Sequence, residues 1–214
     1  MVYVFYYKMS ERLSEVSFNR WMQLMPDFIK EKIKRFRNWQ DAERSLIGNL
    51  LLLQGLQQLE CTHYLLKNLK YTSYQKPYFD NLISFNISHS GDYVVCAISK
   101  IINVGIDIEE VKNIPIIDFE YLFAQEEWDE VLTAKNKWEA FYTLWAKKEA
   151  FLKAIGCGLS QPLNEVIIKK NEIIWQNKKW YLINIQLDDD YKCFICCDFS
   201  NPSIKINQQF FNTI

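Results

Sequence analysis

Val104-Gly105-Ile106-Asp107-Ile108-Glu109 alternates apolar residues with small or acidic ones, which is the period-two pattern of a half-buried β-strand. Asp107 and Glu109 are two positions apart, so both side chains point to the same face of that strand. Two carboxylates at this separation repel unless a positive charge lies between them. A hard divalent cation such as Mg²⁺ prefers oxygen ligands and would supply that charge. An edge strand with a polar outer face is the other interpretation of the same pattern.

A helix is predicted over residues 141–155, because apolar residues recur there at intervals of three and four and Gly156 follows as a terminator. Trp145, Glu149 and Lys153 are successive i, i+4 positions, so their side chains share one stripe of the helix. The carboxylate and the terminal lysine are then neighbours. This pattern fits either a solvated, salt-bridged helix surface or a site that holds a cation and a phosphate.

A strand, turn and second strand are predicted upstream, where Phe85-Asn86-Ile87-Ser88-His89-Ser90-Gly91-Asp92 precedes the apolar run Tyr93-Val94-Val95-Cys96-Ala97-Ile98. A turn with small polar side chains and free backbone N–H groups can cradle an anion. His89 would add a charge-assisted hydrogen bond to a phosphate. Ser88, His89 and Ser90 are equally common as ordinary turn and surface residues.

These motifs resemble, in their order and spacing, those of the 4′-phosphopantetheinyl transferases of the surfactin-synthetase-activating type. The reaction implied by this resemblance moves the phosphopantetheine arm of coenzyme A to a serine of an apo carrier protein and releases adenosine 3′,5′-bisphosphate. The matching stretches are Asp41-Ala42-Glu43-Arg44-Ser45, Lys76-Pro77, Asn86-x-Ser88-His89-Ser90, Gly105-x-Asp107-x-Glu109 and Trp145-x-x-Lys148-Glu149-Ala150-x-x-Lys153.

The resemblance also implies a role for each matching residue. Asp107, Glu109 and Glu149 would bind Mg²⁺, which bridges the diphosphate oxygens and stabilises the leaving group. Lys153 and His89 would hold phosphate oxygens. The expected catalytic residues are Glu149, Asp107 and Lys153, and the expected coenzyme A-binding residues are Lys32, Arg44, Lys76, Pro77, Asn86, Ser88, His89 and Lys153.

The attacking serine hydroxyl must lose a proton, and the sequence leaves the acceptor open between Glu149, a metal-bound water and another acid. Glu127 is such an acid, because it lies in Phe123-Ala124-Gln125-Glu126-Glu127-Trp128, which resembles the family's helix opening after the metal strand. Glutamates near a helix start are also explained by complementation of the helix dipole. We expect Glu149 to be the base.

Basic residues concentrate in a predicted helix whose apolar stripe consists of Ile29, Ile33 and Phe36. We expect this helix to receive the 3′-phosphate of coenzyme A at Lys32, with Arg44 and Lys76 completing the nucleotide end. A solvated helix face is the alternative for each individual lysine. A nucleic acid partner is disfavoured, since the net charge of the chain is only −1. The basic residues of the cluster are Lys30, Lys32, Lys34, Arg35 and Arg37.

The resembling family implies an α+β fold of two similar lobes that form a pseudo-dimer. Each lobe is a small antiparallel-type sheet packed with helices, and coenzyme A lies in the cleft between them. We expect the lobes to span residues 1–103 and 104–214. A repeated hairpin pattern fits this duplication, because Ser90-Gly91-Asp92-Tyr93 and Asp188-Asp189-Asp190-Tyr191 each precede an apolar strand. A monomer is expected, since two fused lobes can form the cleft that smaller relatives build between subunits.

Several elements are predicted within the lobes. A long helix is expected over 41–60, and its Gly48 and Gly55 indicate close packing against a neighbour. Strands are expected near 164–169, 172–176, 179–187 and 191–199. The short apolar segment 112–119 is predicted either to meet the carrier protein or to cover the core.

Length and composition limit which classes of protein this sequence can belong to. The 214 residues are 49% hydrophobic, which suffices for a substantial core in one large or two small domains. There is no apolar run long enough to span a bilayer, and residues 1–7 have no charged leader, so we expect a cytoplasmic protein without a membrane partner. The six cysteines are expected to be reduced, and Cys193-x-x-Cys196 lacks the second pair that a zinc site would need.

Three functions fit these patterns. The first is a Mg²⁺-dependent phosphopantetheinyl transferase. The second is a metal-dependent nucleotide or diphosphate hydrolase, which the same three carboxylates would serve if water replaced the serine. The third is a non-catalytic module that binds coenzyme A or a carrier protein. The experiment that separates them measures both the modification of the carrier and the release of nucleotide.

Overall fold

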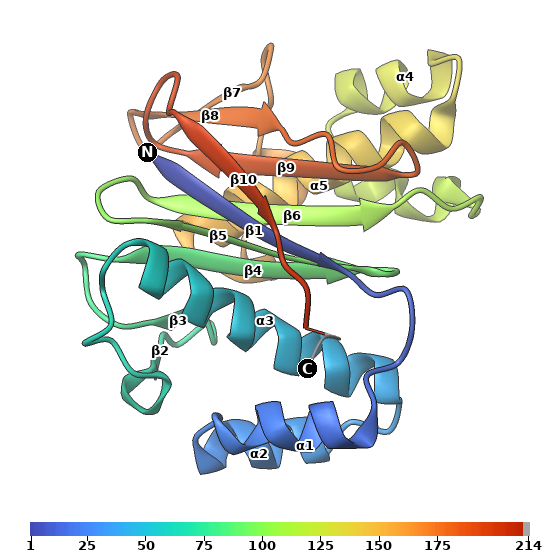
Figure 1. Ribbon diagram of the computed structural model, residues 1–214. Coiled ribbons are helices and arrows are strands. Elements are labelled where there is room, and N and C mark those ends of the chain that lie inside the picture. Colours follow the sequence, from blue (N-terminus) through green and yellow to red (C-terminus); the bar gives the residue numbers. More distant parts are fainter. Residues whose placement is uncertain (212–214) are drawn as a thin grey trace.

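Two four-stranded sheets organise the molecule (Figure 1). The computed structural model describes residues 1–211, apart from the side chain of Leu159. The first sheet has the strand order β10-β1-β5-β4 and the second the order β6-β9-β8-β7, while β2 and β3 form a separate pair. The strands are β1 (Val2–Lys8), β2 (Lys70–Tyr71), β3 (Pro77–Tyr78), β4 (Ser84–Ser90), β5 (Tyr93–Ser99), β6 (Val104–Glu110), β7 (Glu172–Trp175), β8 (Lys178–Asn184), β9 (Tyr191–Cys197) and β10 (Ile204–Gln208).

Each sheet carries one long helix. In Figure 1, α3 runs along the first sheet and α5 lies behind the second. The predicted α+β class with antiparallel sheets and two similar halves is confirmed. The helices are α1 (Glu15–Gln23), α2 (Asp27–Lys34), α3 (Trp39–Gln58), α4 (Gln125–Thr133) and α5 (Lys137–Ile155), and the 3₁₀ segments are η1 (Leu66–Asn68), η2 (Ile116–Leu122), η3 (Gly158–Ser160) and η4 (Leu163–Glu165).

The helix expected over 41–60 is α3, and its two glycines pack as predicted. A Cβ atom added at Gly48 would lie 2.9 Å from Ile87 Cγ2, and one added at Gly55 would lie 2.8 Å from Ile98 Cγ2. The missing side chains let β-branched residues of β4 and β5 fit against the helix backbone. Apolar burial then holds the helix to the sheet at about 1.5–3 kcal/mol for each fully buried large side chain.

Helix α5 approaches its sheet even more closely, at Gly105 of β6. A Cβ atom at this position would overlap the Ala150 carbonyl oxygen and the Ala154 nitrogen, which are backbone atoms of the helix. The helix begins after Asn136, whose side chain accepts a hydrogen bond from Glu139 N at 3.2 Å. It ends at Gly156, whose φ of +77° is the left-handed conformation of a helix C-cap.

The two sheets meet where β4 lies beside β6, and polar side chains replace the usual backbone ladder there. Val104 N donates to Ser84 Oγ at 3.0 Å, Ile106 N donates to Asn86 Oδ1 at 3.1 Å, and Glu110 N donates to Ser90 Oγ at 3.1 Å. These N–H groups of an edge strand would otherwise lack partners in the interior. Alternate residues of β4 therefore join the two halves and face the carboxylate-bearing strand.

Two features of the second half differ from expectation. The strand predicted at 164–169 is wrong: this segment contains η4 and one isolated bridge between Lys169 and Glu172. The carbonyls of Leu163, at the start of η4, and of Val166 accept hydrogen bonds from Lys148 Nζ on α5. They are therefore not free to pair with another strand. Strand β10 pairs in parallel with β1, and it therefore belongs to the first sheet (Figure 1, red beside blue). The strands expected near 172–176, 179–187 and 191–199 are present as β7, β8 and β9.

The expected lobe boundary at 103/104 falls in the connection between β5 and β6. Residues 212–214 of the expected second lobe lie outside the described residues. The six cysteines are free. Within residues 1–211, no helix is both long and apolar enough to cross a membrane.

Candidate active site

Three side chains from three different motifs meet at the junction of the sheets. Ser88 Oγ, on β4, donates to Asp107 Oδ1 on β6 at 2.8 Å. Lys153 Nζ, on α5, donates to Ser88 Oγ at 2.9 Å and forms an ion pair with the same Asp107 oxygen. The structure thus brings together residues that are 65 positions apart in the sequence. We call this group the Ser88–Asp107–Lys153 cluster.

Asp107 has one carboxylate oxygen without a partner. The residue is 2% exposed, and its Oδ2 atom is buried without a hydrogen-bond partner among the described residues. A buried charged oxygen is unfavourable when unpaired, so the site favours an additional donor or a cation at this atom.

Glu109 and Glu149 add negative charge around Asp107. Burial, and next the charge of Asp107, raise the pKa of Glu109 to about 7, although Ser90 Oγ donates to it at 3.0 Å. Burial also raises the pKa of Glu149, where the charge of Lys153 opposes the shift and that of Asp107 adds to it. Three interacting carboxylates with raised pKa values at two of them are the environment that a divalent cation would stabilise.

The donor set fits Mg²⁺, because it consists of carboxylate oxygens and includes the unpartnered Oδ2 atom of Asp107. In the described part of the chain, however, no three His, Cys, Asp or Glu side chains form a group gathered closely enough to hold a metal. The ion pair between Lys153 and Asp107 explains part of this, because the ammonium occupies one oxygen of a predicted ligand.

Arg44 and His89 lie beside the cluster on the first half. Arg44 Nε and Nη2 donate to the Gly91 carbonyl at 3.0 and 2.6 Å, and Nη1 donates to Asp41 at 2.9 Å. The arginine thereby holds the turn that follows β4. His89 has an exposed side chain, but desolvation by surrounding protein atoms lowers its pKa, and the charges of Arg44 and Lys153 lower it further. A phosphate between these groups would have two cations and an imidazole near it.

Lys76 reaches the second half at the end of α5. Its Nζ atom donates to the Ala154 carbonyl at 2.9 Å, and burial lowers its pKa to about 8. The lysine therefore caps the C-terminal end of the helix that carries Glu149 and Lys153.

The other expected coenzyme A-binding residues lie outside the cluster. Lys32 is exposed on α2, and Pro77 pairs with Tyr71 between β3 and β2. Asn86 is buried, and its oxygen accepts the Ile106 N–H described above. Contacts of these residues with coenzyme A remain predictions.

Lys148 is a residue whose role the sequence patterns did not predict. It is fully buried, and its ammonium donates to Glu127 Oε2, to the Leu163 carbonyl at 2.9 Å and to the Val166 carbonyl at 2.7 Å. Glu127 Oε1 accepts a hydrogen bond from Ile168 N at 3.1 Å. Both oxygens of Glu127 are therefore used, which disfavours this residue as the proton acceptor. The sequence does contain a sign of this burial, because Lys148 is four positions before the buried Leu152 and so lies on the apolar stripe of α5.

Comparison with known proteins decides the family. Residues 12–101 match the family model described as 4′-phosphopantetheinyl transferase, N-terminal, and residues 103–196 match that of the 4′-phosphopantetheinyl transferase superfamily. The chain is 38% identical over 177 residues to the 4′-phosphopantetheinyl transferase gsp of Aneurinibacillus migulanus, which covers 78% of this chain and 73% of that protein. This chain belongs to the 4′-phosphopantetheinyl transferase superfamily.

Two further relatives of this transferase show how far the similarity extends. It is 32% identical over 204 residues to the 4′-phosphopantetheinyl transferase Sfp of Bacillus subtilis, with 88% of both chains covered. It is 34% identical over 149 residues to the L-aminoadipate-semialdehyde dehydrogenase-phosphopantetheinyl transferase of Mus musculus, which covers 61% of this chain and 48% of that protein. The family resemblance predicted from the motifs is confirmed.

Proposed function

We propose that this transferase moves the 4′-phosphopantetheine arm of coenzyme A to a serine of an apo carrier protein and releases adenosine 3′,5′-bisphosphate. Membership of the superfamily supports the reaction type. One observation carries the location of the site: Ser88, Asp107 and Lys153 come from three separate motifs and are joined by hydrogen bonds at the junction of the halves. Catalysis of this reaction requires alignment of the serine with the diphosphate and neutralisation of charge on the departing oxygens.

Asp107, Glu109 and Glu149 are the residues that would hold Mg²⁺. The unpartnered Asp107 oxygen and the raised pKa of both glutamates support this assignment. When bound, the ion supplies positive charge for the diphosphate oxygens as the phosphorus–oxygen bond to the nucleotide breaks.

Lys153 and His89 bind the phosphate oxygens in this proposal, and Arg44 fixes the turn beside them. The ammonium of Lys153 lies against Ser88 Oγ at the junction, where this flexible, charged side chain would meet the diphosphate. Coenzyme A continues from there toward Lys76 and Pro77 and toward the basic helix at Lys32.

Glu149 is the proposed proton acceptor. Its raised pKa brings it closer to the pH at which a carboxylate is an effective base, and Lys153 on the same helix face limits the shift. The carrier serine attacks the β-phosphorus, its proton passes to Glu149, and adenosine 3′,5′-bisphosphate leaves with the electrons of the broken bond.

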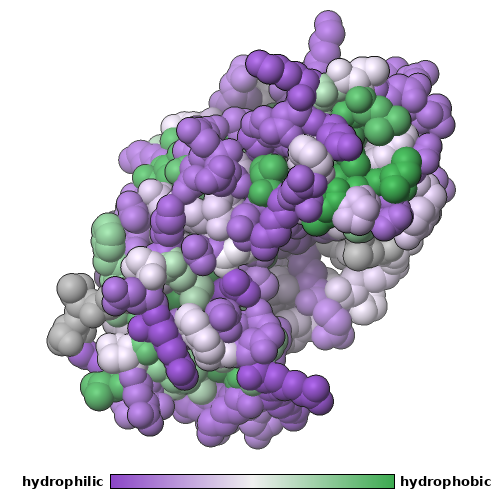
Figure 2. Space-filling model, turned by 90° about the vertical axis from the view of Figure 1, so that its right-hand side faces the viewer, coloured by the Kyte–Doolittle hydropathy of each residue, from purple (hydrophilic) through white to green (hydrophobic). Residues whose placement is uncertain are grey.

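The carrier protein is proposed to dock on the second half, near the segment 112–119. Figure 2 views the right-hand side of the molecule in Figure 1 and shows hydrophobic side chains gathered in its upper part, on the side where Figure 1 labels α4. Ile117 of η2 is 57% exposed and Leu132 of α4 is 49% exposed. Exposed apolar groups of this kind mark protein interaction sites. We further propose that the transferase acts as a monomer in the cytoplasm.

The experiment incubates the protein with coenzyme A, Mg²⁺ and purified apo carrier proteins, and it measures carrier mass and free nucleotide together. The proposal expects the carrier to gain one phosphopantetheine and the nucleotide to appear in equal amount. Nucleotide release without carrier modification would indicate a hydrolase. Binding of coenzyme A without either product would indicate a non-catalytic module, and both outcomes would overturn the proposal.

A further inference from the structure

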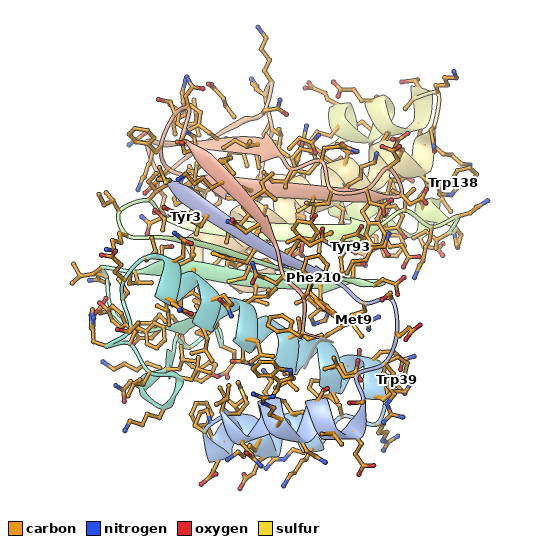
Figure 3. All side chains as sticks on the ribbon, viewed as in Figure 1. Tyr3, Met9, Trp39, Tyr93, Trp138 and Phe210 are labelled. Carbon is orange, nitrogen blue, oxygen red and sulfur yellow. The ribbon has the colours of Figure 1, made fainter. Side chains whose placement is uncertain are left out.

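A cavity lies in the first half, and none of the Ser88–Asp107–Lys153 cluster lines it, although its Lys34 and Arg37 belong to the basic cluster expected to meet coenzyme A. Its volume is about 690 Å³, which falls within the range of small-molecule pockets. It is bordered by the segment after β1, by α1, by the end of α2 and by the first turns of α3, and it opens to solvent. Trp39, labelled at the lower right of Figure 3, marks the start of α3 at this cavity.

Glu43 is one of the lining residues, and one of its carboxylate oxygens is buried without a hydrogen-bond partner among the described residues. The residue is 2% exposed. Its Oε1 atom accepts a hydrogen bond from Leu13 N at 3.0 Å, whereas Oε2 is buried and has no hydrogen-bond partner among the described residues. A lone unpaired oxygen of this kind is rare in folded proteins and favours an external donor. Burial raises the pKa of Glu43, and the Leu13 N–H and the charge of Arg12 oppose the shift.

The walls of the cavity are aromatic and its rim is cationic. Phe18, Phe36 and Trp39 contribute ring surfaces, and the Arg12 guanidinium lies 5.4 Å from the centre of the Trp39 ring. Lys34 and Arg37 add two exposed positive charges. The lining therefore combines a buried carboxylate with aromatic side chains and exposed positive charges.

Helix geometry separates this cavity from the active site. Adjacent residues of a helix point about 100° apart. Glu43 is directed to Leu13, whereas Arg44 is directed to the Gly91 carbonyl beside His89. The cavity and the active site thus use different faces of α3.

We propose that this cavity is a second ligand site, distinct from the transfer site. It takes a small planar molecule that carries a hydrogen-bond donor at one end and a carboxylate or phosphate at the other. The donor meets Glu43 Oε2, the ring packs against Trp39, and the anion lies between Lys34 and Arg37.

The test uses 4-aminophenyl phosphate as the probe and measures its affinity for the full-length protein by titration calorimetry and ligand-observed NMR. Phenyl phosphate lacks the donor, and aniline lacks the anion. We expect the probe to bind at least about tenfold more tightly than either fragment, which corresponds to one well-placed hydrogen bond or charge contact. Equal affinity of the probe and phenyl phosphate would overturn the proposal.

Variants locate the binding. Glu43→Gln and Arg37→Ala should each weaken probe binding about tenfold, whereas Glu31→Gln, which alters an exposed carboxylate of α2 outside the cavity, should leave it unchanged. Arg37 is exposed, so its variant tests the proposal even if Glu43→Gln fails to fold. Unchanged binding in Arg37→Ala would contradict the site. Displacement of the probe by coenzyme A would show that the cavity is part of the coenzyme A site, and would overturn its assignment as a second one.

Discussion

In each half of this transferase, glycine lets a long helix pack closely on a sheet. The glycine lies in the helix in one half and in the strand in the other. In the first half it is in the helix, at Gly48 and Gly55, and isoleucine side chains of the sheet fill the space. In the second half it is in the strand, at Gly105, and the helix backbone itself fills the space. The closer approach places α5 directly over β6, so that Lys153 reaches Asp107. The first half supplies cations and a turn, and the second supplies the carboxylates.

The hairpins that suggested duplication also meet at the junction. The rings of Tyr93 and Tyr191 are 4.6 Å apart, and Asp92 N donates to Tyr191 Oη at 3.0 Å. Figure 3 labels Tyr93 close to the level at which the two sheets adjoin. The equivalent turns therefore hold the halves together beside the site.

Lys148→Met tests whether α5 depends on its buried ion pair. The substitution leaves Glu127 buried without its cation, so we expect the free energy of unfolding to fall by about 3–5 kcal/mol. Urea denaturation measures this. The double variant Lys148→Met/Glu127→Gln should recover part of the loss, and a single variant as stable as the wild type would contradict the structural role of the pair.

Gly105→Ala compared with Gly48→Ala tests the difference between the halves directly. The new methyl group at residue 105 meets helix backbone, which cannot rotate away, so we expect a loss of about 3 kcal/mol or more. At residue 48 it comes within 2.9 Å of Ile87 Cγ2, so this isoleucine must shift, and the helix gains about 0.5–1 kcal/mol of propensity. Urea denaturation of both variants should show a smaller loss of stability for Gly48→Ala than for Gly105→Ala. Equal losses would remove the distinction.

Lys153→Met tests whether Lys153, the proposed catalytic lysine, differs in role from the structural Lys148 on the same helix. We expect turnover to fall by about 10²-fold, since one charge on the phosphate oxygens is lost. The free energy of unfolding should fall by less than in Lys148→Met, because the Lys153 side chain is partly exposed and Asp107 keeps its hydrogen bond from Ser88. Steady-state transfer assays and urea denaturation check the two parts. Parallel loss of both would make Lys153 a structural partner of Asp107.

Lys76 connects the halves at the end of α5 and gives a pH-dependent effect. Its pKa is about 8 in the folded protein and 10.5 for an unperturbed lysine, so the unfolded chain binds more protons between these values. Through this group, the free energy of unfolding should therefore rise as the pH increases from about 8 to 10.5. Below pH 8, Lys76 is charged in both states, so the full cost of burying its charge is present. Unfolding curves of the wild type and Lys76→Met should differ in slope only in that window, and parallel profiles would contradict the assignment.

The elements that sequence patterns predicted are those with local periodicity. The alternation in β6, the apolar stripe of α5 and the glycines of α3 each depend on neighbours within a few turns. The pairing of β10 with β1 joins Ile204 to Val2, and a contact of such separation leaves no local pattern. The segment 164–169 resembles a strand, but its Val166 carbonyl accepts from Lys148 and its Ile168 N–H donates to Glu127, which are tertiary contacts.

The candidate site was also predicted only in part. The motifs contained Ser88, Asp107 and Lys153, and their convergence follows from the junction of β4, β6 and α5. Lys148 was quoted only as part of a motif and was given no role, because a motif does not tell that its charge is neutralised inside the protein. The ion pair between Lys153 and Asp107 depends on how closely α5 packs on β6 at Gly105. The spacing of apolar residues in the sequence does not predict that distance.

The assignment of the transfer site at Asp107 is tested by the intact mass of an apo carrier protein after reaction with coenzyme A and Mg²⁺, catalysed by the wild type or by Asp107→Asn. We predict that the wild type adds one phosphopantetheine, and that Asp107→Asn slows this at least about 10²–10³-fold while it remains folded. Glu11→Gln, which alters an exposed carboxylate between β1 and α1, should match the wild type. An Asp107→Asn enzyme that modifies the carrier at the wild-type rate would contradict the assignment of the site.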